Sequence, residues 1–216
     1  DATSFRLGGI GSDIYLLSRL QAHADVHLGS HLQVFMQVAD YRAPDARLKR
    51  AVDQDRLDLE QGFAGMMFRL GRGTLMVRIG RQEIPLDRQR FLGNRDGPNV
   101  RQPFDGIRLI YDVGQWRLSG YYSQPVQTND GDPFDDRSSR CLTFSGVRVD
   151  HKRVASGVVS MYFASLQNET AGYLATSGRE ARNVFDVRYA GKHGTWDWDL
   201  EGMGQAGRRG EKEIRA

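Results

Sequence analysis

Residues 16–28 read LLSRLQAHADVHL, and this stretch decides the fold. From Arg19 onward every second residue is polar or charged, and the residues between them are apolar. Successive side chains of a β-strand point to opposite faces, so this alternation predicts a strand with one apolar and one charged face. The apolar set is Leu16, Leu20, Ala22, Ala24, Val26 and Leu28, and the polar set is Arg19, Gln21, His23, Asp25 and His27.

The same alternation returns in later segments of the chain. Within residues 57–63 the expected apolar face includes Phe63, and the charged face carries Asp58 and Glu60. These segments predict about ten strands, and no segment shows a convincing amphipathic helix. The alternating segments span residues 32–38, 57–63, 107–111, 116–123, 185–189 and 196–201; segments 75–84, 141–149 and 154–166 mix the two faces and are assigned as strands partly by position.

The links between these strands vary in length in a regular way. Short and long links alternate along the chain until the final link, near residues 206–213. A soluble β-sandwich has no reason to sort its loops in this way, whereas outer-membrane barrels have short periplasmic turns and long extracellular loops. The links therefore predict an all-β, antiparallel up-and-down transmembrane β-barrel. The short links are 28–31, 71–73, 112–115, 150–153 and 191–195, and the long links are roughly 41–56, 85–104, 124–140 and 167–182.

The composition of the 216 residues excludes several other classes of protein. The chain has no run of about 18 apolar residues, which a transmembrane helix would need. The single Cys141 excludes an internal disulfide and a CxxC metal site. The 30 basic residues include only four lysines and form no basic block, so no nucleic-acid partner is expected. Arginine is the cation that binds carboxylates through two parallel hydrogen bonds.

Two motifs follow one another closely: GRQE at residues 80–83 and RQRFLGNRDGPNVRQPFDGIRLIY at residues 88–111. In this order they resemble the alginate export family of outer-membrane barrels, in which a GRQE strand precedes an N-x-x-R-x-F-D-G segment. Residues 19–29, 53–63 and 196–207 also look like that family. The residues at matching positions of the second motif are Asn99, Arg101, Asp105 and Gly106.

The resemblance implies a single-chain barrel of about 18 strands in the bacterial outer membrane, carrying anionic polysaccharide or other small anions. Residues 1–216 are then expected to be a single β-barrel domain, as one part of that larger barrel. The predicted function is that of an outer-membrane porin or exporter for anionic solutes, such as the acidic polysaccharide alginate. Outer-membrane lipid or lipopolysaccharide is the other expected partner, and periplasmic secretion partners stay open. The alternative is a soluble periplasmic β-sheet protein that binds acidic saccharide on one charged face.

Charged residues of both signs are expected to face the lumen. The arginines could form a track along which carboxylate groups exchange, or they could pair with the acids and stiffen the barrel. Arg81 with Glu83, and Arg101 with Asp105, are expected to belong to a structural network. The lumen arginines are Arg19, Arg78, Arg81, Arg90, Arg101, Arg108, Arg117 and Arg188; the acidic counter-charges are Asp58, Glu60, Glu83, Asp105, Asp186, Asp197, Asp199 and Glu201.

Other chemistry finds little support. His23, Asp25 and His27 share a strand face, but alternate residues of one strand lie about 6.5 Å apart and diverge too far for a metal ion. The acidic loop 129–136, NDGDPFDD, has enough oxygens for Ca²⁺ but lacks the spacing of an EF-hand, so an ordinary surface loop is the favoured interpretation. No GxSxG motif or phosphate loop occurs. We therefore expect no enzyme, no metal and no cofactor.

Overall fold

The computed structural model describes residues 15–44, 46, 52–84, 98–173 and 176–216. These residues form twelve strands and no helix. The ten long strands are those expected from the sequence, seven from their alternation and three partly by position, and β7 and β12 are short additions. The strands are β1 (Ser18–Leu28), β2 (Leu32–Arg42), β3 (Asp55–Leu70), β4 (Gly73–Gln82), β5 (Phe104–Val113), β6 (Trp116–Gln127), β7 (Arg137–Ser138), β8 (Leu142–Val154), β9 (Gly157–Tyr173), β10 (Thr176–His193), β11 (Trp196–Arg209) and β12 (Lys212–Arg215).

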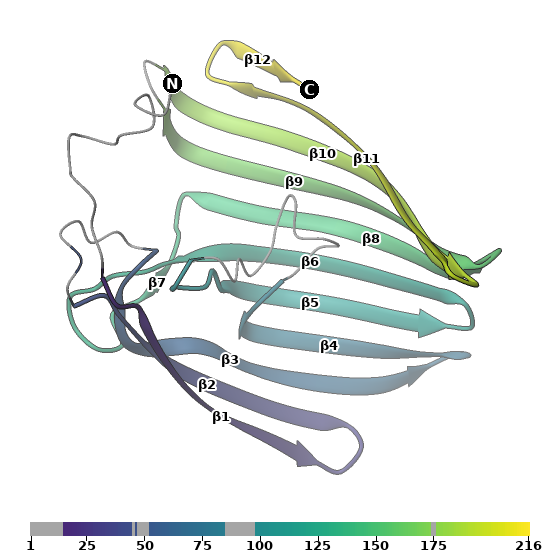
Figure 1. Cartoon of the computed structure of the whole chain (residues 1–216), viewed down its shortest axis with the longest axis horizontal. Helices are drawn as coiled ribbons and strands as arrows, with labels where there is room; N and C mark the ends of the chain where they lie inside the picture. Colours follow the sequence, from purple (N-terminus) through teal and green to yellow (C-terminus); the bar gives the residue numbers. More distant parts are fainter. Residues whose placement is uncertain (1–14, 45, 47–51, 85–97, 174–175) are drawn as a thin grey trace.

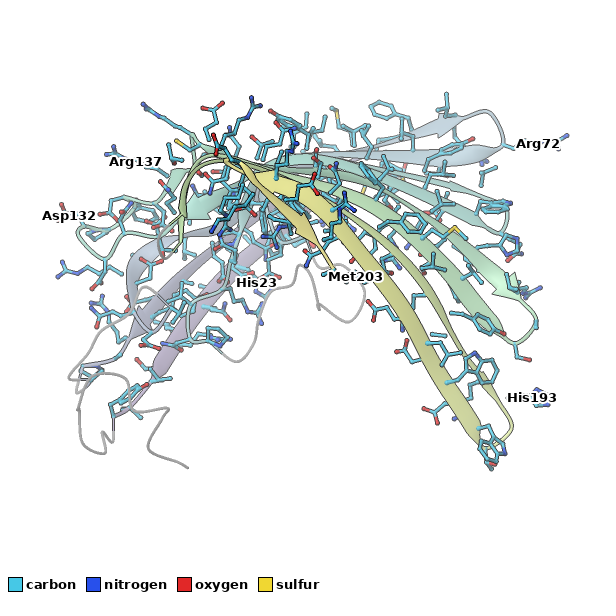
Figure 2. The ribbon with its side chains drawn as sticks, turned by 90° about the horizontal axis from the view of Figure 1, so that it is seen from above. His23, Arg72, Asp132, Arg137, His193 and Met203 are labelled. Carbon is cyan, nitrogen blue, oxygen red and sulfur yellow. The ribbon has the colours of Figure 1, made fainter. Side chains whose placement is uncertain are left out.

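The strands pair in chain order into one antiparallel, up-and-down sheet (Figure 1). Only β7 lies off this path, where it pairs with the end of β6. The sheet curls strongly, so that it has a convex and a concave face (Figure 2). It is not closed, because β1 and β12 lie at opposite ends of the strand order. The predicted fold class, a partial up-and-down barrel, is confirmed.

The tight turns after β1, β3, β5, β8 and β10 gather at one end of the sheet, while the longer connection after β6 and the short β11–β12 turn lie at the other (Figure 1). Gly29, Gly71, Gly114 and Gly194 have φ between 54° and 64° in these turns, and Ala155 takes the same conformation in the turn from β8 to β9. One expected long link is wrong. Residues 167–182 belong largely to β9 and β10, whose pairing continues out to Tyr173 and Thr176.

The burial pattern of the two faces is the reverse of that of a soluble sheet. On β10, Val184 and Asp186 are 1% and 0% exposed, whereas Phe185 between them is 54% exposed. Likewise Leu20 on β1 is 72% exposed. His23 lies on the concave side in Figure 2, so the apolar residues that alternate with it lie on the convex face. Water would penalise such a large apolar surface, whereas lipid would cover it.

A bulge in β3 changes which residues share a face. Gln37 pairs with Gln61 but the next residue, Val38, pairs with Leu59, so Glu60 is an extra residue in β3. An extra residue reverses the alternation beyond it. Phe63 is therefore only 7% exposed and lies on the concave face. The expectation that Phe63 is on the apolar outer face is wrong.

Apolar and aromatic side chains also pack along the concave face between β5 and β10. Tyr121 of β6, the Cα partner of Arg108, stacks on Phe144 of β8 with ring centroids 5.0 Å apart. This packing supports the strands that carry the charged residues described next. The cluster consists of Ile84, Phe104, Tyr121, Phe144, Tyr162, Ala164 and Val184.

Candidate functional site

A row of aromatic rings crosses β1, β2 and β3 on the concave face and ends at two arginines. His23 stacks on Phe35 with ring centroids 5.8 Å apart, and Phe35 stacks on Phe63 at 5.1 Å. The guanidinium carbon of Arg78 on β4 lies 4.1 Å from the centroid of Phe63. Arg78 is in turn the Cα partner of Arg108 on β5. The sheet register therefore places two arginines side by side at the end of the row.

Arg78 and Arg108 form no ion pair with a carboxylate among the described residues, although the charge of Asp25 acts on Arg78 without direct contact. The Nε of Arg78 is buried and finds no acceptor there. Arg108 lies in the field of three other arginines, Arg78, Arg117 and Arg148. A partly buried cation and a buried donor without partners both cost free energy. The pair is therefore a place on the concave face where no ion pair neutralises the positive charge.

Two other predicted arginines are neutralised by neighbouring strands. Arg117 donates to Asp112 across the β5–β6 hairpin (Nη2–Oδ2 2.9 Å), and Lys152 contacts the same carboxylate. Arg188 on β10 donates through Nε and Nη2 to the two oxygens of Asp199 on β11, at 2.7 and 2.9 Å. Such bidentate pairs fix two strands relative to one another.

The arginines of the two motifs also have acidic partners, but the partners are exchanged relative to the expectation. Arg81 donates through Nε and Nη2 to Asp105 at 3.0 and 3.2 Å. Arg101 donates through Nη1 to Glu83 at 3.1 Å. Arg81 and Asp105 are Cα partners across β4 and β5, which brings them together more directly than two residues on one strand. Arg81 also lies 3.6 Å from Asp58.

The glycines of the two motifs allow β3, β4 and β5 to approach one another. Gly80 and Gly106 are Cα partners. Gly80 has φ 129°, and a Cβ at this residue would lie 2.2 Å from the carbonyl oxygen of Gly62. Only glycine accepts this conformation and this contact. The GRQE and FDG motifs are therefore in direct contact, because they pair with each other across β4 and β5.

The remaining predicted site residues occupy several different environments. Arg19 donates to the carbonyl of Pro98 at 2.9 Å and lies over the ring of Tyr41. Glu60 accepts hydrogen bonds from Gln21 and Gln37, at 2.6 and 3.0 Å. Arg90 lies outside the described residues. Asp186 is fully buried, Glu201 is the Cα partner of Arg188, and Asp197 is the Cα partner of Lys192 beside the β10–β11 turn.

Sequence reasoning missed Arg148 and the aromatic row. Arg148 on β8 pairs with Asp150 at 2.8 Å and donates to Ser160 Oγ at 3.1 Å. It was hidden because Phe144 shares its face, so that residues 141–149 show no clean alternation. Phe35 carried a usable signal, because it stands between Val34 and Met36 on the otherwise polar face of its strand.

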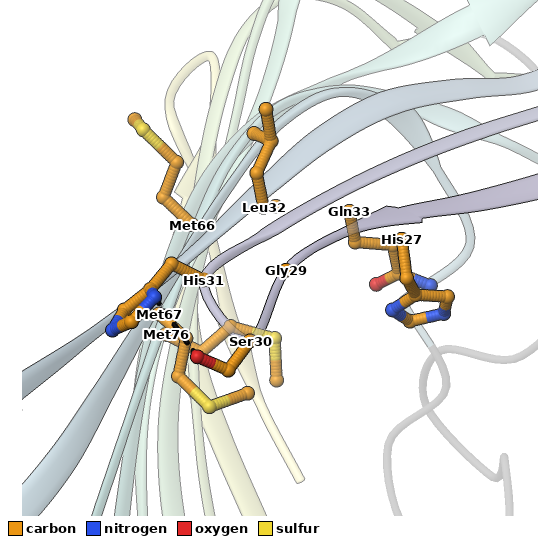
Figure 3. A pocket seen from close by; sticks show the side chains of 10 residues that line it. His27, Gly29, Ser30, His31, Leu32, Gln33, Met66, Met67 and Met76 are labelled. Carbon is orange, nitrogen blue, oxygen red and sulfur yellow. Dashed lines mark hydrogen bonds between the residues drawn. The ribbon is translucent and has the colours of Figure 1, made fainter.

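The three residues weighed as metal ligands do not converge. His27 Nε2 lies 3.2 Å from Asp25, while His23 is engaged by Phe35. A hollow of about 110 Å³ at the β1–β2 turn is lined in part by His27 and His31, which lie well apart (Figure 3). His31 Nδ1 is 3.0 Å from Ser30 Oγ.

Acidic side chains do converge at the opposite end of the sheet. Asp58, Asp135 and Asp136 each offer a carboxylate oxygen, and these oxygens lie within 4.8 Å of one another. Burial raises the pKa of Asp136 to about 6; a hydrogen bond from the Asn129 amide opposes this shift, and the charge of Asp58 reinforces it. This is the one such group of three potential metal ligands in the described part of the chain.

An up-and-down antiparallel sheet with an apolar convex face and a charged concave face defines the class of transmembrane β-barrel proteins. The described residues contain no helix long and apolar enough to cross a membrane. The profile of the family described as alginate export matches residues 1–216. The chain belongs to this family, whose members are outer-membrane transport proteins and not enzymes. No curated protein and no solved structure matches the chain significantly.

Proposed function

We propose that the concave face of this sheet lines a path for acidic polysaccharide, alginate or another polyuronate, across the outer membrane. The observation that carries the proposal is the Arg78–Arg108 pair, which forms no ion pair with a carboxylate of the described residues. A uronate carboxylate would supply the acceptors that these guanidinium groups lack. Membership of the alginate export family supports the same class of solute.

The stacking on Phe63 suits Arg78 to a transient contact. The ring covers one face of the guanidinium and holds it in place, while stacking leaves the terminal N–H groups at the guanidinium edge available to an acceptor. A carboxylate can therefore bind without a large rearrangement of the side chain and leave again. Conduction requires binding that is favourable enough to admit the solute and weak enough to release it.

The ion-paired arginines have a different part in this proposal. Arg81 and Arg188 donate hydrogen bonds to Asp105 and Asp199, so they hold neighbouring strands together. They contribute little net positive field. The field that attracts an anion then comes mainly from Arg78 and Arg108, and an electropositive patch on a low-dielectric surface concentrates anions near it.

The convex face is proposed to contact outer-membrane lipid. Leu20, Leu109 and Phe185 project from it at 72%, 41% and 54% exposure, which favours a membrane protein over a soluble periplasmic sheet protein. We further propose that the open sheet is one part of a larger closed barrel, because β1 and β12 each leave one edge without a strand partner in the described residues.

Channel block by a polyuronate tests the proposed function. The full-length protein is reconstituted in planar bilayers, and the current is recorded while oligouronate is added. We expect a concentration-dependent block in the wild type, weakened about threefold or more in the double variant Arg78→Gln/Arg108→Gln, as loss of a carboxylate contact predicts.

The matched control removes an arginine together with its counter-charge, in Arg188→Gln/Asp199→Asn, and should keep the wild-type block. An unblocked wild-type channel, or equal weakening of the block in both double variants, would contradict the proposal.

A further inference from the structure

One edge of β3 has no strand partner near the long-loop end of the sheet. β4 pairs with β3 only from Gly62 onward, so residues 55–61 are left uncovered on that side. The connection after β6 covers this edge: the amide of Phe134 donates to the carbonyl of Leu57 at 3.0 Å, and the amide of Asp136 donates to Asp58 Oδ2 at 3.1 Å. The acidic loop, residues 129–136, is thus held against β3.

The contact between the acidic loop and β3 brings like charges together. The potential ligand oxygens of Asp58, Asp135 and Asp136 lie within 4.8 Å of one another. Asp130 adds a fourth carboxylate, held by Gln54 and 3.9 Å from Arg56. Carboxylates this close repel one another unless a cation neutralises them.

Two buried carboxylate oxygens without partners lie beside the same acidic cluster. Asp55, the first residue of β3, is only 3% exposed, and its Oδ1 is buried without a hydrogen-bond partner. Its side chain lines the same small cavity as Asp58 and Asp136. Asp135 Oδ1 is also buried and without a partner. A buried carboxylate oxygen with no donor is costly, so two of them beside an acidic cluster indicate a missing positive partner.

The arginines at hand do not supply that partner. Arg81 pairs with Asp58 through Nη1 at 3.6 Å and with Asp105 through Nε and Nη2, and it has no ion pair with Asp55 or Asp135. Arg56 is largely exposed and reaches only Asp130. Asp55 and Asp135 have no arginine or lysine among their contacts in the described residues.

The structure assigns a divalent-cation site to Asp55, Asp58, Asp135 and Asp136, at the contact between the acidic loop and β3. An all-carboxylate set favours a hard cation, and an irregular loop that supplies several carboxylates suits Ca²⁺ better than Mg²⁺, which demands near-ideal octahedral geometry. The bound ion would fasten the loop to the uncovered edge of β3. This inference is independent of the anion path, which lies on other residues.

Calcium titration of the full-length protein tests the assignment. The protein is stripped with a chelator in a zwitterionic detergent free of lipopolysaccharide, and Ca²⁺ binding is followed by calorimetry. We expect one saturable site per chain. Asp135→Asn and Asp136→Asn should each weaken binding at least about tenfold, as losses around metal sites do.

Asp132→Asn is the matched control, because Asp132 is an exposed acid of the same loop whose side chain is not among the ligands. It should change the affinity by less than about twofold, as a screened surface charge does. Equal weakening in all three variants, or no saturable site in the wild type, overturns the assignment.

Hydrogen exchange provides a second measurement that needs no variant. Ca²⁺ should slow the exchange of the Phe134 and Asp136 amides, which donate to β3, and leave the amides of the β5–β6 turn unchanged. Identical exchange of these two amides with and without saturating Ca²⁺ would also overturn the assignment.

Discussion

Arg78 and Arg81 lie three residues apart on β4, and the sheet gives them opposite surroundings. Arg81 meets Asp105 on β5 and also donates to the Leu59 carbonyl of β3 at 3.0 Å. Arg78 meets Arg108 on β5 and the ring of Phe63 on β3. The cross-strand register, and not the residue type, therefore decides whether an arginine of β4 meets a carboxylate or another arginine.

The largest expected effect comes from removing the paired arginine. Arg81→Met leaves Asp58 and Asp105 without their cation, and loss of one partner of a buried ion pair costs about 3–5 kcal/mol. Urea unfolding of the protein in lipid vesicles would measure this loss. Arg78→Met serves as the matched variant on the same strand. A similar loss of stability in both variants would break the comparison.

A cation on the other face of β5 should be costly for a different reason. Leu109 adjoins Arg108 but projects from the convex face, where Arg near the bilayer midplane costs about 2–4 kcal/mol. Leu109→Arg should lower the unfolding free energy in lipid by that amount. In the control, Gln33→Arg, the new cation lies on the concave face beside Asp25 and should cost little. If Leu109→Arg were as stable as the control, the convex face would not contact lipid.

Removing an unpaired arginine should have the opposite sign. Arg108→Met deletes a partly buried cation that faces three other arginines, so we expect the unfolding free energy to rise by about 1 kcal/mol. The same urea unfolding assay measures it. A loss of stability of the size expected for Arg81→Met would mean that Arg108 has a structural role.

Much of the fold could be predicted from the sequence, because alternation is a local property. His23 lies on the concave face, as expected, and the alternation of β1 places Arg19 and Asp25 on the same side of the strand. The prediction failed for Phe63, because the extra residue in β3 reverses the alternation and no local signal marks it. It also failed for residues 167–182, whose polar composition resembles a loop although they continue β9 and β10.

The candidate site was less predictable, because it depends on pairing between distant residues. The motifs correctly indicated that Arg81 and Arg101 belong to an ion-pair network, but only the register decides that Arg81 meets Asp105 and Arg101 meets Glu83. The meeting of Arg78 and Arg108 is likewise a property of the β4–β5 register. No residue pattern within β4 or β5 alone predicts that Arg78 and Arg108 pair.

The reversal potential of the reconstituted full-length protein across a salt gradient tests the central claim most directly. The account predicts a wild-type channel that prefers anions. Arg78→Gln/Arg108→Gln should lower the anion-to-cation permeability ratio about threefold, or roughly 0.65 kcal/mol, while Arg188→Gln/Asp199→Asn, which removes a cation with its counter-charge, leaves the ratio near the wild-type value. A cation-preferring wild type, or equal shifts in the two double variants, would contradict the claim that Arg78 and Arg108 supply the charge that solutes meet.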